Sequence, residues 1–126
     1  MIHEHHFTPD EANSALGRIE PLLTELRESR DRLTDADVRQ ALSEASPGDG
    51  GGEPGRQVGE AFLRFRSLLI ELQQSGIVLR DLERGLIDFP AIREGREVYL
   101  CWQLGEERVT HWHELEGGFS GRRPLD

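Results

Sequence analysis

Apolar residues recur at helical spacing over the first third of the chain. They follow alternating steps of three and four residues, at Leu16, Ile19, Leu23, Leu26 and Leu33, with Arg30 at the one position that breaks the apolar series. This spacing places them on one face of a helix. Thr8, Pro9 and Glu11 form a capping box with proline at the first helical position, so we expect the helix to begin at Pro9. Weaker spacing extends the predicted helical region over residues 9–45, with a bend at Pro21.

A second helical stretch follows a segment without apolar residues. Residues 46–55 are rich in glycine and proline and predict a flexible loop. Beyond the loop, apolar residues recur at alternating steps of four and three, at Val58, Phe62, Phe65, Leu69 and Leu72. With Gly76 as a C-terminal stop, they predict a second helix over residues 56–76. Two such stripes joined by a loop indicate a long antiparallel helical hairpin.

Some apolar residues lie outside both stripes, at Leu22, Leu63 and Leu68. A thin hairpin buries only one face of each helix, so these leucines need either the rest of the domain or another subunit to cover them. We therefore expect a homo-oligomer, in its simplest form a dimer.

The spacing changes from helical to alternating in the second half of the chain. Between Glu97 and Leu104 every second residue is apolar, at Val98, Leu100, Trp102 and Leu104. This alternation predicts a strand with one apolar face, followed by a turn and a return strand. We expect a small antiparallel sheet of three or four strands over residues 77–115 and an irregular tail over residues 116–126. Together with the helices they form a single α+β domain over residues 1–126.

Composition narrows the classes of function. The net charge of −9 argues against nucleic acid or an anionic membrane as a partner, because both require a basic surface. The absence of lysine excludes Schiff-base chemistry and a P-loop. The single cysteine, Cys101, cannot form an internal disulfide, and the first residues lack the apolar run of a signal peptide. These features lead us to expect a cytoplasmic protein.

The sharpest chemical hypothesis is a metal site on the predicted sheet, because Cys101, His111 and His113 are ligand types for zinc or iron. The register of the hairpin decides it. A three-residue turn sets Cys101 opposite His111, which puts both histidines and the cysteine on one face. A turn of even length sets Trp102 opposite His111, which buries the histidines without the cysteine. A hydrogen-bonded or surface pair of histidines is the simpler alternative.

Three further groups of residues suggest chemistry. Asp88 or Glu97 would be a carboxylate beside His113 in acid–base catalysis, although carboxylates at strand ends are more often solvated or paired with arginine. The segment Gly117–Arg122 would hold an anion, or be a flexible tail. One group precedes the helix cap and is expected to be frayed and solvated: His3, His5 and His6.

Five short motifs are spread over nearly the whole chain: Phe7–Asn13, Gly85–Pro90, Leu100–Glu106, Trp112–Glu114 and Gly118–Arg122. On these motifs the sequence resembles the bacterial domain of unknown function 2203 family. The family carries no established activity. Its pattern includes tryptophan and histidine at positions 112 and 113 without demanding histidine at 111, which weakens the metal hypothesis. The resemblance implies a shared site among the motif residues Asp88, Cys101, Glu106, His113 and Arg122.

We therefore expect an uncharacterised cytoplasmic bacterial protein that is a self-associating interaction or ligand-binding module. Its candidate ligand or recognition residues are Asp88, Glu97, Cys101, Trp102, Glu106, Trp112, His113 and Arg122. The alternative is a small metal-dependent enzyme with a site on the sheet around His113. Its zinc or iron would be held by Cys101, His111 and His113.

Overall fold

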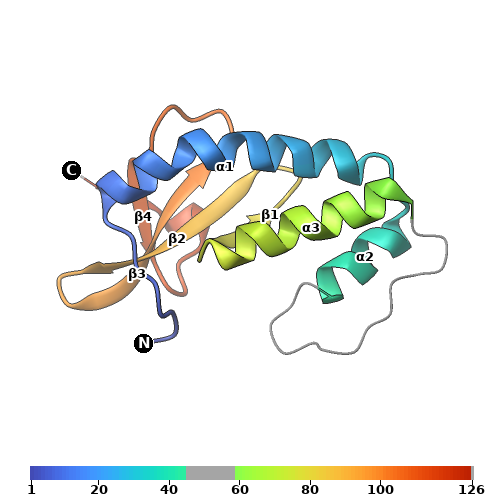
Figure 1. The fold of residues 1–126 in the computed structure, drawn as a ribbon. Helices are drawn as coiled ribbons and strands as arrows, with labels where there is room; N and C mark the ends of the chain where they lie inside the picture. Colours follow the sequence, from blue (N-terminus) through green and yellow to red (C-terminus); the bar gives the residue numbers. More distant parts are fainter. Residues whose placement is uncertain (45–58, 126) are drawn as a thin grey trace.

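A computed structural model describes residues 1–44 and 59–125. The chain forms a layer of helices followed by an antiparallel sheet (Figure 1). The helices are α1 (Pro9–Arg30), α2 (Asp35–Glu44) and α3 (Glu60–Gln74). The strands are β1 (Val78–Asp81), β2 (Leu86–Arg93), β3 (Arg96–Gln103), β4 (His111–Glu114) and β5 (Arg123–Pro124), with the short 3₁₀ helix η1 (Phe119–Gly121) before β5. This arrangement confirms the α+β class.

Helix α1 begins where the sequence predicts. The Thr8 hydroxyl oxygen accepts a hydrogen bond from the Glu11 backbone N–H at 3.1 Å, and the Glu11 carboxylate accepts one from the Thr8 backbone N–H at 2.8 Å. Pro9 takes the first helical position. The helix continues through Pro21 for 22 residues, because proline removes one hydrogen bond of the ladder without ending the helix here.

The predicted helical region over residues 9–45 is wrong in one respect, because it consists of two helices. α1 ends at Arg30, and a turn separates it from α2. Thr34 and Asp37 form a second capping box, in which the Asp37 backbone N–H donates to the Thr34 hydroxyl at 3.2 Å and the Asp37 carboxylate accepts from Thr34. This local cap starts a new helix, so the hairpin is shorter than its apolar spacing indicates.

Helices α1 and α3 run side by side in opposite directions, and α2 folds back beside α3 (Figure 1). The apolar residues of the two predicted stripes supply the buried contacts between α1 and α3. Two of the leucines outside the stripes, Leu22 and Leu68, are also buried within the chain, whereas Leu63 is 52% exposed. The predicted loop at residues 46–55 and the predicted first turn of the second helix at residues 56–58 lie outside the described residues.

The sheet has five strands in the order β1-β2-β3-β4-β5, so each strand pairs with its neighbours in sequence. It contains one strand more than the upper limit of the prediction. The additional strand, β5, falls in the predicted irregular tail, where Arg123 pairs with Trp112. A two-residue strand that ends in proline has no alternating pattern, so only its contact with β4 identifies it.

One face of the sheet packs against the helices and completes the hydrophobic core. The apolar face predicted for β3 is confirmed at Val98, Leu100 and Trp102, all at most 2% exposed. The neighbouring strands extend this face with Ile87, Phe89, Ala91 and Trp112. The helices therefore cover one side of the sheet, and the chemistry of the molecule is left to the other side.

The turn between β1 and β2 gives a test of the fold. Gly85 has φ +64°, and a Cβ added there would lie 2.5 Å from Leu104 Cβ. Gly85→Ala should lower the free energy of unfolding by about 2 to 4 kcal/mol, measured by urea denaturation. The strain of a positive φ and the overpacking against Leu104 add in this variant. Gly95→Ala is the matched control, since Gly95 has φ +77° but an added Cβ there meets nothing within 4 Å. Equal losses in the two variants would contradict the packing argument.

Candidate functional site

The face of the sheet that turns away from the core carries a buried polar cluster. Four residues share this face because side chains alternate along a strand: Asp88 of β2, Tyr99 and Cys101 of β3, and His113 of β4. Asp88 and His113 are each only 2% exposed. Burial of ionisable groups is costly unless they are paired, so each requires a partner.

Asp88 and His113 are partners of each other. The His113 Nε2 atom lies 2.9 Å from Asp88 Oδ1, although β2 and β4 are not neighbours and the contact passes over β3. The other ring nitrogen, Nδ1, lies 2.6 Å from the backbone carbonyl oxygen of Glu114. Both ring nitrogens thus face acceptors, which favours the doubly protonated imidazolium. Burial alone lowers the pKa of His113, but the hydrogen bonds to Asp88 and Glu114 outweigh burial and raise it.

The hairpin has the register that the metal hypothesis requires. Cys101 lies opposite His111, and Tyr99 lies opposite His113. Even so, within residues 1–44 and 59–125 no three histidine, cysteine, aspartate or glutamate side chains form a group that could hold a metal ion. His113 turns to Asp88, and the Nδ1 atom of His111 lies 3.0 Å from the Thr110 hydroxyl. On this shared face His113 is held by hydrogen bonds, which is the simpler alternative to a metal ligand.

Arg80 is a further member of the cluster, which the sequence pattern does not predict. Its Nε atom donates to Asp88 Oδ2 at 2.8 Å, and its guanidinium carbon lies 4.8 Å from the centre of the Tyr99 ring. The register of β1 against β2 shifts between Leu79 and Asp81, so Arg80 is the extra residue of a β-bulge. Bulges redirect a side chain and occur near functional sites. The alternation of β1 gives no sign of this shift, and only the pairing with β2 exposes it.

A pocket of about 270 Å³ opens directly onto the cluster. Its polar lining comes from Arg80, Asp88 and His113, and its apolar lining from Leu86 of β2 and from the loop after β4. The complete lining is Arg80, Leu86, Asp88, His113, Leu115, Glu116, Gly118 and Phe119. The pocket thus combines paired buried charges with an apolar wall, which is the usual composition of a small-molecule site.

The predicted candidates Cys101, Glu106 and Arg122 support the wall of this pocket. The Glu106 carboxylate accepts hydrogen bonds from Arg122 Nη1 at 3.0 Å and from the Gln103 backbone N–H at 2.8 Å. The guanidinium of Arg122 lies 4.2 Å from the centre of the Phe119 ring. Burial raises the pKa of Cys101 to about 11, despite a hydrogen bond with Arg122 that lowers it. Cys101 is therefore a neutral thiol near pH 7. The contacts of Arg122 with Glu106 and Phe119 hold the segment Gly117–Arg122 in place.

The two tryptophans belong to the core rather than to the polar face. Trp102 is fully buried, and its indole N–H donates to the Glu106 carbonyl oxygen at 3.1 Å. Trp112 is 6% exposed, and the guanidinium carbons of Arg93 and Arg123 lie 4.9 and 5.5 Å from its ring centre. Both point toward the helices, which separates them from the pocket.

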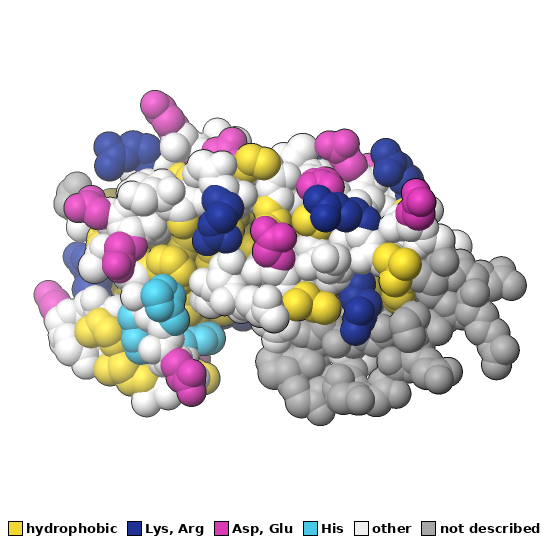
Figure 2. Space-filling model, viewed as in Figure 1, with side chains coloured by type: hydrophobic (Ala, Val, Ile, Leu, Met, Phe, Trp, Pro, Cys, Tyr) yellow, Lys and Arg dark blue, Asp and Glu magenta, His cyan; other side chains and the backbone are white. Residues whose placement is uncertain are grey.

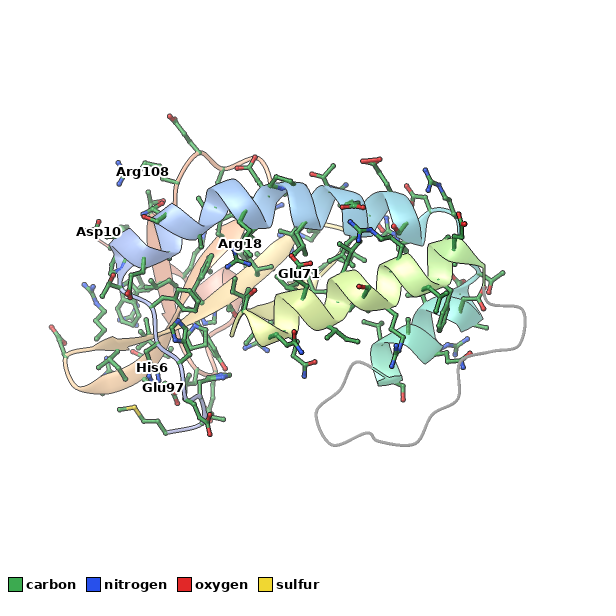
Figure 3. All side chains as sticks on the ribbon, in the orientation of Figure 1. His6, Asp10, Arg18, Glu71, Glu97 and Arg108 are labelled. Atoms are coloured by element: carbon green, nitrogen blue, oxygen red, sulfur yellow. The ribbon has the colours of Figure 1, made fainter. Side chains whose placement is uncertain are left out.

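Glu97 lies apart from the polar cluster and binds the N-terminal segment. Its carboxylate accepts hydrogen bonds from the Ile2 and His3 backbone N–H groups at 2.8 and 3.0 Å, and His6 Nε2 lies 2.8 Å from it (Figure 3). Partial burial would raise the pKa of Glu97, but the hydrogen bonds from His6, Ile2 and His3 outweigh it and lower the pKa to about 2.

The expectation that the N-terminal histidines are frayed is wrong for His3 and His6. His3 Nε2 lies 2.7 Å from the Tyr99 hydroxyl, so the first residues reach the polar cluster. The ring of His5, which is exposed, packs edge-on against Phe7. In Figure 2, histidine side chains gather where the N-terminal segment lies. Contacts with β3, distant in sequence, hold this segment, and no local pattern predicts them.

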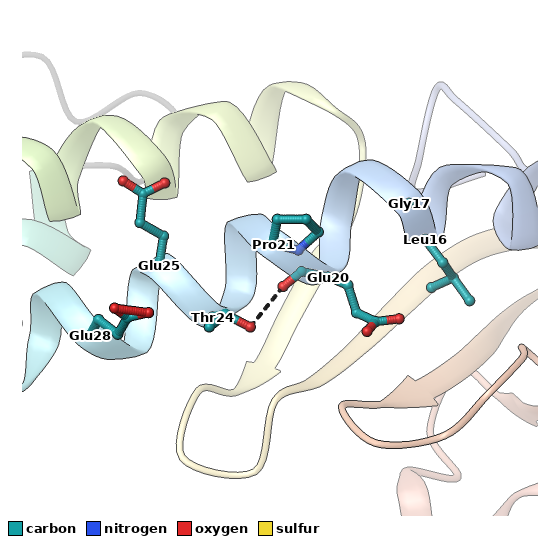
Figure 4. Close-up of a pocket in the computed structure, with 7 residues that line it drawn as sticks. All are labelled: Leu16, Gly17, Glu20, Pro21, Thr24, Glu25 and Glu28. Atoms are coloured by element: carbon teal, nitrogen blue, oxygen red, sulfur yellow. Dashed lines mark hydrogen bonds between the residues drawn. The ribbon is translucent and has the colours of Figure 1, made fainter.

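Three other hollows within residues 1–44 and 59–125 are lined by no buried ionisable group. The hollow on α1 at Pro21, about 590 Å³, has three glutamates spread over successive turns rather than converging (Figure 4). One of them, Glu25, pairs with Arg64 at 2.6 Å. A hollow of about 690 Å³ between the start of α1 and β5 has its charged side chains exposed or half-buried, among them Asp10 and Arg108. The pocket at Asp88 and His113 is therefore the strongest candidate site in the part of the chain that the structure describes.

Among residues 1–44 and 59–125, none of the helices combines the length and the apolar character needed to cross a bilayer. A family model described as "Uncharacterized conserved protein (DUF2203)" matches residues 5–125. The match includes every member of the polar cluster and all the residues that line the pocket. No curated protein and no solved structure matches the chain.

The raised pKa of His113 predicts a pH dependence of stability. A histidine pKa that is raised in the folded state stabilises the folded protein. This stabilisation is complete below the pKa of histidine in the unfolded state, about 6.5, and is lost as pH rises through the pKa in the folded state. Asp88→Asn should lower the pKa of His113 and cost roughly 3 kcal/mol of unfolding free energy, because it breaks a buried ion pair. Histidine NMR titration and urea denaturation measure the two effects. His111→Gln is the control on the same strand, and titration of wild-type His113 below its ordinary pKa would contradict the assignment.

The lowered pKa of Glu97 makes a prediction about the N-terminal segment. Glu97→Gln should increase amide hydrogen exchange over residues 2–6 and speed proteolysis there, since the segment loses its anionic acceptor. In the wild type, docking should persist below pH 4.5 and be lost as pH falls toward about 2. Glu94→Gln, an exposed change in the adjoining turn, is the control. Unchanged exchange in Glu97→Gln would show that the carboxylate does not hold the segment and that Phe7 and the contact of His3 with Tyr99 suffice.

Proposed function

The chain belongs to the DUF2203 family of uncharacterised conserved proteins, and we propose that it is a small-molecule-binding module whose site is the pocket at Asp88 and His113. The observation that carries the proposal is a buried ion pair that forms part of the lining of a pocket. A packed apolar pair of similar size would serve stability at least as well as a buried ion pair. Ionisable groups with shifted pKa values in a concave site are characteristic of binding and catalysis.

The geometry around Arg80 supports the same proposal. A bulge interrupts an otherwise regular antiparallel ladder and directs Arg80 to Asp88 and to the pocket. The side chain of Arg80 remains 41% exposed while that of Asp88 is 3% exposed. The cation is thus anchored at one end and accessible at the other, which suits contact with a ligand from solvent.

Self-association into a homodimer remains part of the proposal, but with a smaller surface than the sequence indicates. Leu22 and Leu68 are covered within the chain, which leaves Leu63 of α3 as the exposed leucine of the three. Leu63 lines a surface hollow of about 580 Å³ together with Arg32 and Arg64. A dimer would bury this part of α3, and light scattering after size-exclusion chromatography should show it. A monomer at micromolar concentration would contradict the dimer and leave the pocket unaffected.

A cytoplasmic location belongs to the same proposal and is supported by the single buried, free Cys101. The alternative, a metal-dependent enzyme around His113, is supported by no ligand set within the described residues. Hydrogen bonds already engage both ring nitrogens of His113. We therefore place a small molecule, rather than a metal ion, in the pocket.

A fragment screen by two-dimensional amide NMR tests the proposal. Fragments at millimolar concentration should shift the Gly118 and Phe119 amides, which belong to the pocket wall. Leu115→Trp should abolish these shifts by filling the pocket, whereas Leu63→Trp, on the distant helix surface, should leave them unchanged. The proposal fails if no fragment shifts these amides, or if the Leu115→Trp variant binds as well as the wild type.

A further inference from the structure

The geometry points to a ligand class for this pocket: a small organic monocarboxylate with a compact apolar group. The inference rests on the proposed function, because it assigns chemistry to the same pocket. It depends on three features of the described residues, which are the net charge of the buried cluster, the donors that remain available on Arg80, and the apolar wall.

The buried cluster carries an excess of one positive charge when His113 is protonated. Arg80 and His113 contribute two positive charges, and Asp88, which accepts from both, contributes one negative charge. The chain as a whole has a net charge of −9, so a positive site on it is a local exception. Asp88 and His113 are buried and the side chain of Arg80 is 41% exposed, so solvent screens this charge less than it screens a charge on the open surface.

The neighbouring carboxylates leave this excess charge in place. Glu116 lines the pocket but is exposed, so solvent screens it. The Glu114 carboxylate pairs with Arg96 at 2.8 Å, and that of Glu106 pairs with Arg122 at 3.0 Å. Arg84, which packs against Phe119, is exposed and therefore screened in the same way as Glu116. The single excess charge of the cluster suits a monoanion better than a dianion such as phosphate.

Arg80 supplies the donors for that anion. Its Nε atom is committed to Asp88, and a hydrogen bond with Tyr99 engages a second N–H of the guanidinium. The side chain is 41% exposed and lines the pocket, so the remaining N–H groups are the donors for a ligand. A guanidinium presents its N–H groups in a planar fork that matches a carboxylate. His113 has both nitrogens committed within the protein, so it contributes charge rather than a hydrogen bond to the ligand.

The rest of the lining selects an apolar group of limited size. Leu86, Leu115 and Phe119 form the apolar part of the wall. Phe119 is fixed between two arginines, with the guanidinium carbons of Arg84 and Arg122 at 4.9 and 4.2 Å from its ring centre. The volume of about 270 Å³ is below the range of about 300 to 1,000 Å³ that is usual for drug-sized ligands. A carboxylate with a single ring or a short branched chain is the class that meets both conditions.

Benzoate and benzamide are the probes, because they have nearly the same shape and differ in charge. In amide NMR titrations of the full chain at about pH 6, benzoate should bind at least about tenfold more tightly than benzamide. Arg80→Gln should remove that preference while benzamide affinity stays within about twofold. Glu116→Gln is the matched control at the rim and should not weaken benzoate binding. As pH rises through the pKa of His113, benzoate affinity should fall and benzamide affinity should stay constant.

The outcomes separate this inference from the proposed function. Equal binding of benzoate and benzamide at the Gly118 and Phe119 amides would overturn the carboxylate class and leave the pocket as a binding site. Inorganic phosphate that binds as tightly as benzoate would also overturn the class. If neither probe binds while other fragments do, the class is again wrong. If no fragment of any charge binds, the proposed function itself fails.

Discussion

The contact between Asp88 and His113 is the constraint on which the polar face of the sheet depends. It joins two strands that are not neighbours, so it fixes the register of β2, β3 and β4 together. A shift of one residue in any of these pairings would send one partner to the core. The contact also fixes charge, because a buried imidazolium needs a buried carboxylate, and that carboxylate can then hold Arg80. One contact thus determines both strand alignment and the electrostatics of the pocket.

Stability and chemistry are divided between the two faces of the sheet. The helices and the apolar face form one continuous hydrophobic core. The opposite face is covered by segments outside the sheet, namely the N-terminal residues held by Glu97 and the loop with η1 held by Glu106 and Arg122. Loops that cover a rigid sheet are a common arrangement at binding sites, because they change shape without disturbing the core.

Local signals in the sequence predicted much of the fold and little of the site. The capping box at Thr8 and the alternation in β3 are set by neighbouring residues, so both are confirmed. The second capping box, at Thr34, is equally local, but the apolar spacing continues past it and predicts a single helical region. In contrast, the bulge at Arg80 and the docking of His3 depend on strands and segments far away in sequence. The motif residues Asp88 and His113 were identified as candidates, but their pairing required the register.

The tryptophans and the tyrosine lie on different faces of the sheet, so their spectroscopic signals report on different parts of the protein. Both tryptophans of the chain lie on the core side of the sheet, where their emission reports whether helices and sheet are docked. The single tyrosine, Tyr99, lies on the polar side, between Arg80, His3 and His113. Tryptophan fluorescence therefore reports mainly on the docking of helices and sheet, while the ultraviolet difference signal of the one phenol reports on the polar side. The molecule contains two intrinsic reporters on opposite faces of a single sheet.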